Sequence, residues 1–456
     1  MEVNNSIFRE NDIRGIYPDQ LNESTITLIG KAISHKCRSE GISSISVGRD
    51  GRLSGKSLLN SFCQSLVNEG LHVTNIGMVT SPMLYFEAKT NESKSGIIIT
   101  GSHNPKNHNG LKMVINDKPI SGMEILSLID ELQDTSYPKG SLVDKDIKEN
   151  YLSAVVESID IKGDKKFKIV LDSGNGVAGS IAPELFKRIG CEVIELFSEV
   201  DGNFPNHHPD PSKEENIQDL IKCVLDNNAD LGLAFDGDGD RVGLITDAGK
   251  NIFPDKFMMM LSESILSKKQ GSIVFDIKCS NHLEKLISKK NGKPIMAPTG
   301  HFHIKKAIKE NSSLLGGEMS GHIFFNDKWY GFDDGPYAAV RAAEILAKSN
   351  RSISDIFRDF PESFSTPELN ITVTDDNKFE IIDRFMANSN IDGDKILIDG
   401  LRVNFNNGWG LLRASNTTPK LVLRFEGDTE ETMNRIQNEF ISELSRICPE
   451  IDINLD

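Results

Sequence analysis

The sequence predicts an α/β protein with three similar mixed α/β domains, followed by a C-terminal α+β domain that contains an antiparallel sheet. Through most of the 456 residues, short apolar runs alternate with helical patterns, which is typical of parallel strands covered by helices. Near the end of the chain, the apolar runs follow one another too closely for long crossovers. Strands joined so briefly pair in antiparallel fashion, which distinguishes the last domain from the others.

Polar stretches interrupt this pattern, and we expect the domain boundaries there. At roughly 100 to 150 residues per domain, the length indicates three or four domains. The four expected domains cover residues 1–147, 148–250, 251–362 and 363–456.

The expected elements follow from the apolar periodicity of each domain. In the first domain they are strands at 44–50 and 95–100 and a helix at 56–70. In the second they are strands at 168–176, 192–197 and 231–236 and helices at 180–190 and 215–229. In the third they are strands at 272–277, 293–298 and within 314–325, and helices at 281–290, 303–311 and 335–348. In the last they are strands at 368–373, 400–405, 409–415 and 421–427 and helices at 379–389 and 430–447.

Charge and hydropathy exclude several kinds of partner. Because 67 acidic residues face 51 basic ones, for a net charge of -16, we expect no broad surface for nucleic acid. No apolar run approaches 18 residues, and the start has no basic segment followed by an apolar one. We therefore expect a cytoplasmic protein without a membrane partner. The six cysteines form no C-x-x-C pair, which favours free thiols.

The segment TGSHNP carries the first chemical signal. It follows the expected strand at 95–100, so Ser102 is expected on a turn at the carboxyl end of a strand, where α/β sheets bind ligands. With the permissive Gly101 before it and His103 after it, Ser102 is a candidate phosphate acceptor. The alternative is a polar loop closed by an Asn-Pro turn.

The segment DGDGDR follows the expected strand at 231–236 and places carboxylates at every second position. Asp236, Asp238 and Asp240 can direct their oxygens at one hard cation such as Mg²⁺, because the glycines between them let the loop curl. Three like charges this close repel one another unless a cation compensates them. A calcium loop of EF-hand type fits poorly, since Arg241 stands at its sixth position and Asp247 at its twelfth.

Two later segments offer groups that bind sugars and phosphates. GEMSGH puts the Glu318 carboxylate two residues from the Ser320 hydroxyl, a spacing suited to neighbouring sugar hydroxyls; an ordinary turn is the alternative. RASNTTP, with an arginine shortly after it, offers the donors that a phosphate dianion needs, against a structural turn or cap. These donors belong to Arg413, Ser415, Asn416, Thr417 and Arg424.

These four segments resemble the phosphoserine, metal, sugar and phosphate loops of the bacterial phosphomannomutase/phosphoglucomutase family, in the α-D-phosphohexomutase superfamily, and occur in the family's order. The resemblance spans almost the whole chain. It extends to DIRG (12–15), VGRDGRLSG (47–55), DGNFPNHHPDP (201–211), PTGH (298–301) and GFDDG (331–335). It implies a heart-shaped arrangement of the four domains around a central cleft, to which each domain contributes one loop.

The resemblance also implies an activity. The expected enzyme is an intramolecular phosphotransferase that interconverts hexose 1-phosphate and hexose 6-phosphate through phospho-Ser102. Hexose 1,6-bisphosphate is the expected intermediate and activator, and small phosphosugars are the expected partners. Mg²⁺ would be held by Asp236, Asp238, Asp240 and one oxygen of the phosphoserine.

Further roles are carried over by position. Lys112, His301 and His322 match candidate proton-transfer and positioning residues, and His103 joins the catalytic group beside Ser102. Arg14, Arg241 and Lys278 would add positive charge around the reacting phosphate. Glu318 and Ser320 would bind the O3 and O4 hydroxyls of the sugar. The phosphate that is not transferred would be bound by Arg413, Ser415, Asn416, Thr417 and Arg424.

One position departs from the family pattern, and two alternatives stay open. Asn11 stands where the family commonly has tyrosine. Met319 favours mannose and glucose phosphates over glucosamine phosphate. One alternative is an aspartyl phosphatase or mutase of the haloacid-dehalogenase type, with Asp236 as nucleophile. The other is a phosphosugar- or cation-binding protein without catalysis.

Overall fold

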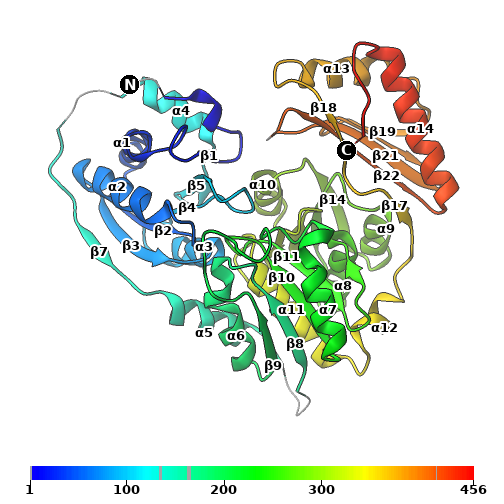
Figure 1. Cartoon of the computed structure of the whole chain (residues 1–456), viewed down its shortest axis with the longest axis horizontal. Helices are drawn as coiled ribbons and strands as arrows, with labels where there is room; N and C mark the ends of the chain where they lie inside the picture. Colours follow the sequence, from blue (N-terminus) through cyan, green and yellow to red (C-terminus); the bar gives the residue numbers. More distant parts are fainter. Residues whose placement is uncertain (1–2, 133–135, 162–165, 417, 456) are drawn as a thin grey trace.

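The computed structural model describes residues 3–132, 136–161, 166–416 and 418–455. In this part of the chain the strands form four sheets, which follow one another along the sequence (Figure 1). The predicted fold class is confirmed: the first three sheets mix parallel and antiparallel pairs, and the last is antiparallel.

The first sheet has the strand order β1-β5-β4-β2-β3-β7, with β6 paired to β5. Its strands are β1 Ile13–Ile16, β2 Ser44–Arg49, β3 His72–Met78, β4 Gly96–Ile99, β5 His108–Ile115, β6 Lys118–Pro119 and β7 Leu142–Asp144. Its helices are α1 Glu23–Ser39, α2 Gly55–Asn68, α3 Ser81–Thr90 and α4 Gly122–Asp130. β2 runs parallel to β3 and β4, whereas β5 is antiparallel to β4 and β1. This hairpin brings Lys112 on β5 alongside β4, which leads into Ser102.

The second sheet has the order β12-β11-β10-β8-β9. Its strands are β8 Lys168–Asp172, β9 Glu192–Leu196, β10 Leu231–Phe235, β11 Val242–Thr246 and β12 Asn251–Ile252. Its helices are α5 Lys148–Ser158, α6 Ala182–Arg188 and α7 Gln218–Asp226. β10 is buried at all five positions, so its carboxyl end holds the following loop firmly.

The third sheet has the order β14-β13-β15-β16. Its strands are β13 Ser272–Asp276, β14 Lys293–Ala297, β15 Leu315–Gly317 and β16 Ile323–Phe325. Its helices are α8 Pro254–Leu266, α9 Asn281–Lys289, α10 His301–Asn311, α11 Gly335–Lys348 and α12 Ile353–Phe357. The second and third domains share one hydrophobic core, to which α3 of the first domain also contributes.

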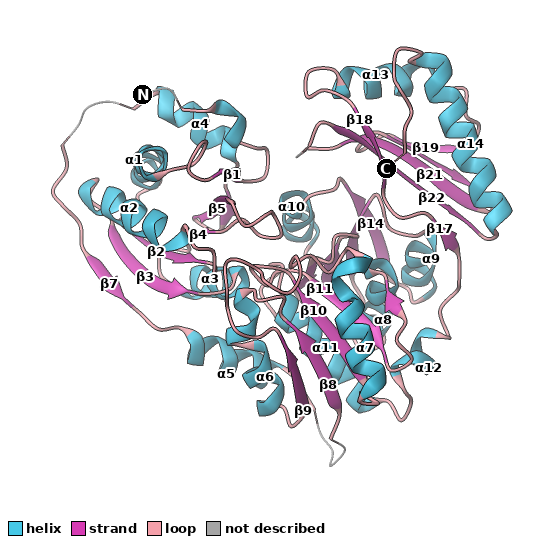
Figure 2. Ribbon diagram, in the orientation of Figure 1, coloured by secondary structure: helices cyan, strands magenta, loops and turns pink. Residues whose placement is uncertain are grey.

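The last sheet has the order β17-β22-β21-β20-β19, with β18 paired to β22. Its strands are β17 Phe364–Ser365, β18 Leu369–Thr372, β19 Asp394–Ile396, β20 Leu401–Phe405, β21 Gly408–Ala414 and β22 Lys420–Gly427. Its helices α13 Lys378–Asn388 and α14 Glu430–Ile447 pack on this sheet (Figure 2). They enclose a core of their own.

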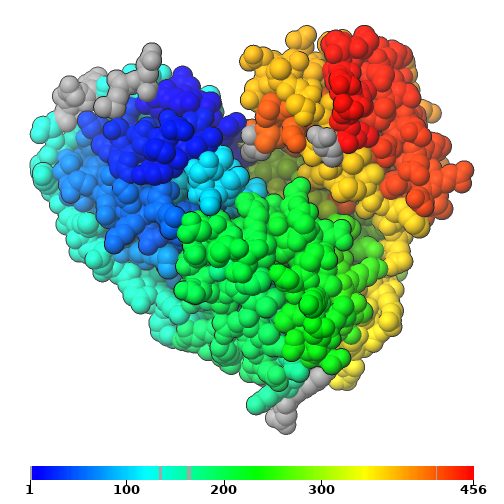
Figure 3. Space-filling model, viewed as in Figure 1, coloured from blue at the N-terminus to red at the C-terminus, as the bar shows by residue number. Residues whose placement is uncertain are grey.

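The last domain contacts the third one through buried groups. The Arg402 guanidinium on β20 donates hydrogen bonds to the carbonyl oxygens of Ile277 and Cys279, the latter at 2.8 Å. It also lies over the Trp409 ring, 3.9 Å from the centroid, and Trp409 packs against Ile277. Figure 3 shows the resulting outline, which is heart-shaped and hollowed between the first and the last domain.

Most predicted elements are present within a few residues of their expected bounds, and α11 coincides with the expected helix at 335–348. The boundaries between the four domains stay a prediction. Within the described residues, none of the helices has the length and apolar character needed to cross a bilayer. The six cysteines are free.

Candidate active site

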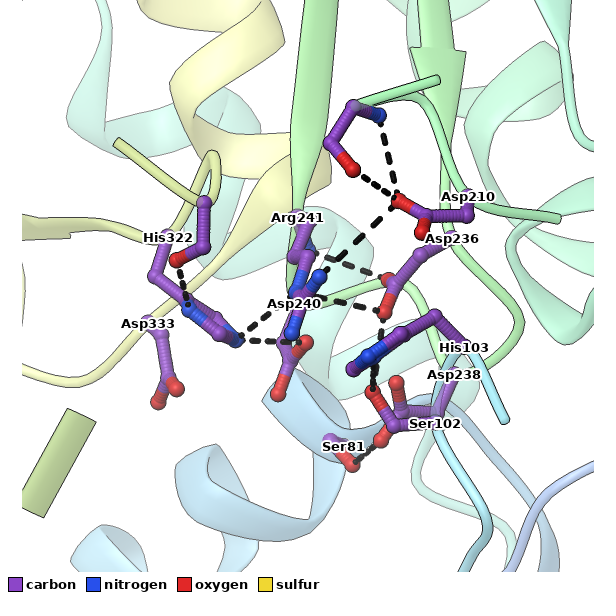
Figure 4. A network of polar contacts seen from close by, with 12 residues as sticks. Ser81, Ser102, His103, Asp210, Asp236, Asp238, Asp240, Arg241, His322 and Asp333 are labelled. Atoms are coloured by element: carbon purple, nitrogen blue, oxygen red, sulfur yellow. Dashed lines mark hydrogen bonds and ion pairs between the residues drawn. The ribbon is translucent and has the colours of Figure 1, made fainter. Parts of the chain in front are cut away.

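The four predicted loops lie at or between the ends of strands. Ser102 follows β4, Asp236 follows β10, and Glu318 lies in the turn between β15 and β16. Arg413 lies near the end of β21. The serine loop and the acidic loop meet directly, and His322 approaches them from the third domain (Figure 4). Three sheets therefore place side chains in one buried group.

Ser102 lies in a strained and buried turn. Its φ is 48°, a left-handed value that costs a non-glycine residue roughly 1–2 kcal/mol. Its side-chain hydroxyl donates a hydrogen bond of 3.0 Å to Asp236 Oδ2 and lies 3.2 Å from His103 Nδ1. Its backbone N–H donates to Thr100 Oγ1 over 2.8 Å. The turn therefore directs the hydroxyl at the acidic loop.

A buried arginine holds this turn in shape. The Arg52 guanidinium donates to four carbonyl oxygens, those of Ser102, Asn104, Pro105 and His108, at 2.6 to 2.9 Å. Its Nε lies 3.2 Å from Asp50 Oδ2. A Cβ at Gly101 would lie 2.5 Å from Arg52 Cζ, so only glycine leaves room for the guanidinium. The sequence reasoning included VGRDGRLSG in the family match but assigned it no role.

The three aspartates form a site that fits a cation. Their ligand oxygens lie within 4.8 Å of one another, and all three side chains are fully buried. Asp238 Oδ1 is buried without a hydrogen-bond partner, and Asp240 Oδ1 faces the His322 ring, whose Nε2 lies 3.2 Å away. Burial and the charges of its two neighbours raise the pKa of Asp236 well above its ordinary value. A hard divalent ion would satisfy these oxygens and relieve their repulsion.

Lys112 supplies one positive charge to this group. Its ammonium donates to Asp238 Oδ2 over 2.6 Å and also to Asp240 Oδ2. Burial alone would lower the pKa of Lys112, but the surrounding aspartates outweigh burial and raise it. Arg241 adds a second charge, with its Nε 3.9 Å from Asp236 Oδ2.

Two histidines of the third domain differ in their electrostatic environment. His322 Nε2 lies 3.2 Å from Asp240 Oδ1, and its Nδ1 lies 3.2 Å from Glu318 Oε2. Although burial opposes it, these carboxylates raise the pKa of His322 to about 9. Burial and the Lys305 charge instead lower the pKa of His301 well below its ordinary value. The centroids of the two rings lie 5.9 Å apart, so the charged His322 ring lies beside the neutral His301 ring.

His103 and Arg14 complete the serine side of the site. Burial and the Arg241 charge lower the pKa of His103 well below its ordinary value, which leaves its ring neutral. Arg14 donates to Asn104 Oδ1 over 2.6 Å and to Asp12 Oδ2 over 2.5 Å. Arg14 Nε is buried without a hydrogen-bond partner.

The predicted sugar loop is tied to its neighbours. Glu318 Oε1 accepts a hydrogen bond of 2.6 Å from the Gly300 N–H. Ser320 Oγ lies 2.8 Å from His322 Nδ1. Asn11 of the first domain lies against Gly300, where an added Cβ would be 3.1 Å from Asn11 Nδ2. The Oδ1 of Asn11 is buried without a hydrogen-bond partner.

The predicted phosphate loop lies with a second group of cations. Arg424 Nη1 donates to the Lys278 carbonyl oxygen over 2.6 Å. The Lys278 ammonium contacts Glu368 Oε1 at 2.5 Å. The structure therefore groups Lys278 with the C-terminal arginines, whereas the resemblance suggested a place around the reacting phosphate.

The other residues of the predicted phosphate loop lie close to the end of β21. Ser415 Oγ accepts a hydrogen bond of 3.2 Å from the Thr418 N–H, and Asn416 is half-buried. Thr417 lies outside the described residues.

Several residues in these groups were missed by the sequence reasoning. Asp333 is fully buried, and its Oδ1 lies 2.7 Å from Lys305 Nζ. The motif GFDDG, which carries Asp333, was the only available signal. Single polar residues such as Glu368 and Asp399 gave no local pattern, because only the fold brings them to Lys278 and Arg413.

This arrangement suits phosphoryl transfer. A buried serine hydroxyl next to a candidate cation site can carry a phosphoryl group, and nearby Lys and Arg charges can neutralise it. A neutral and a protonated histidine can accept and donate a proton. The second group of cations can hold another phosphate.

Comparison with known proteins gives the same result. Four successive family models match: phosphoglucomutase/phosphomannomutase alpha/beta/alpha domains I, II and III at residues 5–136, 149–249 and 253–364, and the C-terminal domain at 368–443. A phosphomannomutase/phosphoglucomutase of Pseudomonas syringae pv. tomato is 48% identical over 452 residues, covering 98% of this chain and 97% of the relative. A phosphoglucomutase of Neisseria gonorrhoeae is 45% identical over 446 residues, covering 96% of each chain. The crystal structure of a phosphoglucomutase/phosphomannomutase family protein from Burkholderia thailandensis, 41% identical, superposes with a TM-score of 0.93 over the whole of both chains. The chain therefore belongs to the phosphoglucomutase/phosphomannomutase family.

Proposed function

We propose that this enzyme reversibly interconverts the 1-phosphates and 6-phosphates of mannose and glucose through phospho-Ser102 and a hexose 1,6-bisphosphate. The observation that carries the proposal is the 3.0 Å hydrogen bond from the Ser102 hydroxyl to Asp236 Oδ2. It joins the phosphate acceptor to a buried group of three carboxylates. The names of the relatives support the same reaction.

Asp236, Asp238 and Asp240 would hold Mg²⁺, together with one oxygen of the phosphoserine. When bound, the ion neutralises charge on the phosphoryl oxygens. Lys112 and Arg241 add positive charge beside the same carboxylates. Much of the catalysis then comes from charge neutralisation and positioning, so Ser102 needs no strong base.

In the first transfer, the bond between phosphorus and Ser102 Oγ breaks, and a bond between phosphorus and the free hydroxyl oxygen of the sugar monophosphate forms. The hydroxyl proton passes to a neutral imidazole. His301 is the candidate acceptor, because its lowered pKa leaves the ring neutral and able to take up a proton. Ser102 Oγ takes up the Nδ1 proton of the neutral His103 ring, 3.2 Å away, while His103 Nε2 accepts a proton from outside the site, so the ring stays neutral. The bisphosphate then turns over, and the second transfer returns its other phosphoryl group to Ser102 by the reverse steps.

The second group of cations makes both orientations of the bisphosphate productive. Arg413 and Arg424, with Ser415, Asn416 and Thr417, would hold the phosphate that is not transferred, and Lys278 would join them. Glu318 and Ser320 would bind sugar hydroxyls that both orientations present. Opening of the last domain would allow the turn, and its closing would keep water from the phosphoserine.

The test is isomerisation of mannose 1-phosphate and glucose 1-phosphate by the purified protein, with Mg²⁺ and a trace of hexose 1,6-bisphosphate. Ser102→Ala removes the hydroxyl that would carry the phosphoryl group, so the isomerisation rate of this variant is expected to fall more than ~100-fold. Ser127→Ala, which changes an exposed serine on α4 of the first domain, is the matched control. A Ser102→Ala variant as active as the wild type would refute the mechanism.

The chemistry of the phosphoprotein separates the two enzyme alternatives. Phosphate on Ser102 is an acid-stable ester, whereas phosphate on Asp236 is a labile acyl phosphate. Release of inorganic phosphate without isomerisation would favour Asp236 as nucleophile. Binding of phosphosugars without any turnover would favour the binding protein.

The relative rates would also identify the preferred sugar. Met319 in GEMSGH supports mannose and glucose phosphates over glucosamine phosphate. We propose a cytoplasmic enzyme that acts on these small molecules and has no nucleic-acid partner. The net charge of -16 supports the last point.

A further inference from the structure

Asp399 connects two loops of the site, although neither the sequence reasoning nor the family match singled it out. Its Oδ2 accepts a hydrogen bond of 2.9 Å from Arg413 Nε. The same oxygen accepts a hydrogen bond of 3.0 Å from the backbone N–H of Thr299. Arg413 belongs to the last domain and Thr299 to the third, so one carboxylate oxygen bridges the two domains.

The backbone around Asp399 is shaped for this contact. Gly400 has a φ of 75°, a left-handed value that suits glycine. A Cβ at Gly400 would lie 2.7 Å from Arg413 Cα and 2.3 Å from the Leu412 carbonyl oxygen. Only glycine lets this turn press against β21. The turn therefore places Asp399 directly beside Arg413.

The contact determines how Arg413 can act. Arg413 is 4% exposed, and its Nε is engaged by Asp399. Because a guanidinium is planar, a fixed Nε also fixes the plane of its two terminal amino groups, which bind phosphate in bidentate fashion. An arginine held in this way loses less conformational entropy when phosphate binds.

The other hydrogen bond of Asp399 leads to the sugar loop. Thr299 precedes Gly300, whose N–H donates to Glu318 Oε1 over 2.6 Å. His301 follows at the start of α10. Through this short segment, the position of Arg413 is linked to the carboxylate predicted to bind sugar hydroxyls and to the neutral histidine.

We propose that Asp399 is a positioning residue for the phosphate that is not transferred. It orients Arg413 and holds the phosphate loop in register with the loop at 298–301. The inference rests on the proposed function only where it concerns turnover, because binding of inorganic phosphate to the Arg413 group can be measured without catalysis.

The experiment compares Asp399→Asn with Asp392→Asn, which removes an exposed carboxylate from the same segment. Hexose 1-phosphate kinetics and calorimetric binding of inorganic phosphate are measured for both. Because the amide of asparagine carries no charge, the charge-assisted hydrogen bond from Arg413 is weakened, and KM and the phosphate Kd of Asp399→Asn are expected to rise about tenfold, with kcat within about twofold. Asp392→Asn is expected to match the wild type.

A double-mutant cycle distinguishes positioning from a general structural role. In an Arg413→Gln background, Asp399→Asn is expected to change the phosphate Kd by less than about twofold, because its effect acts through Arg413. Wild-type phosphate binding in Asp399→Asn, or a full additional loss in the Arg413→Gln background, would overturn the proposal.

Two controls keep the result decisive. If Asp399→Asn lowers the melting temperature, Asp399→Glu is measured instead, with the same expectations, because a carboxylate moved by one methylene cannot meet both N–H groups. If the wild type turns over no hexose phosphate, the proposed function fails, and the phosphate-binding cycle still decides the role of Asp399.

Discussion

The Lys112 ammonium donates a hydrogen bond of 2.6 Å to Asp238 Oδ2, across the boundary between the first and second sheets. Both side chains are buried, and the ammonium also contacts Asp240. A buried charge left without its partner is strongly destabilising. Lys112 therefore stabilises the same carboxylates that are proposed to bind Mg²⁺.

This relationship predicts that Lys112 and a bound metal ion stabilise the same carboxylates, so that the ion partly compensates for the loss of the lysine. A Lys112→Met variant is expected to melt at a lower temperature than the wild type in a metal chelator, by several degrees for a loss of about 3 kcal/mol. Saturating Mg²⁺ is expected to recover more of the melting temperature in the variant, because the ion then compensates otherwise unpaired carboxylates. Thermal denaturation with chelator and with Mg²⁺ measures both values.

Lys118→Met is the control for this prediction, since Lys118 is an exposed lysine on β6, the strand that pairs with the end of β5. It is expected to show the wild-type response to Mg²⁺. An equal Mg²⁺ response in all three proteins would mean that Lys112 and the ion do not share these carboxylates.

Arg52 gives a prediction about the serine turn. Arg52→Met would remove the guanidinium donor from four carbonyl oxygens, and leaving the buried Ser102 carbonyl unpaired costs about 1–3 kcal/mol before relaxation. We expect a lower melting temperature. We also expect a strongly reduced isomerisation rate, because Ser102 would no longer be held at its φ of 48°. Thermal denaturation and the hexose 1-phosphate assay measure the two effects.

The matched control is Arg38→Met, because Arg38 also donates to a carbonyl oxygen, that of Glu69, over 2.6 Å. Its contacts with Glu69 and Tyr137 do not involve the serine turn, so activity is expected to stay near the wild-type value. Full activity in Arg52→Met would show that the turn keeps its shape without the guanidinium.

The sequence contained enough information for the fold class and for the main chemical groups. Asp236, Asp238 and Asp240 lie within one loop, so their convergence could be predicted from spacing alone. The contact between Asp236 and Ser102 could not, because 134 residues separate them and only the packing of two sheets joins them. The hairpin strand β5 was also missed, since Lys112 and its neighbours lack a simple apolar run.

Asn11 gives a prediction about affinity. Its amide lies against Gly300, and its Oδ1 is buried without a hydrogen-bond partner, so a change at this position can shift the loop at 298–301. Asn11→Tyr is expected to change KM for hexose 1-phosphates by a few-fold, about 1 kcal/mol, while kcat stays near the wild-type value. Steady-state kinetics decide this, and unchanged KM and kcat would show that the position is neutral.

His207 gives a prediction about pH. Its Nε2 lies 3.1 Å from both carboxylate oxygens of the buried Asp172. Burial lowers the pKa of His207, but the hydrogen bond and charge of Asp172 outweigh burial, so the pKa is raised above its ordinary value. The stability from this charged pair is therefore fully present below about pH 6.5, the ordinary histidine pKa, and is lost as the pH rises through the raised value.

The melting temperature of His207→Gln should accordingly lie furthest below that of the wild type in mildly acidic buffer, and the difference between the two should narrow at alkaline pH. His72→Gln is the control, because His72 Nδ1 pairs with the Ser141 hydroxyl at 2.9 Å and not with a carboxylate. A melting-temperature difference between His207→Gln and the wild type that stays constant or widens with rising pH would contradict the assignment of a charged pair.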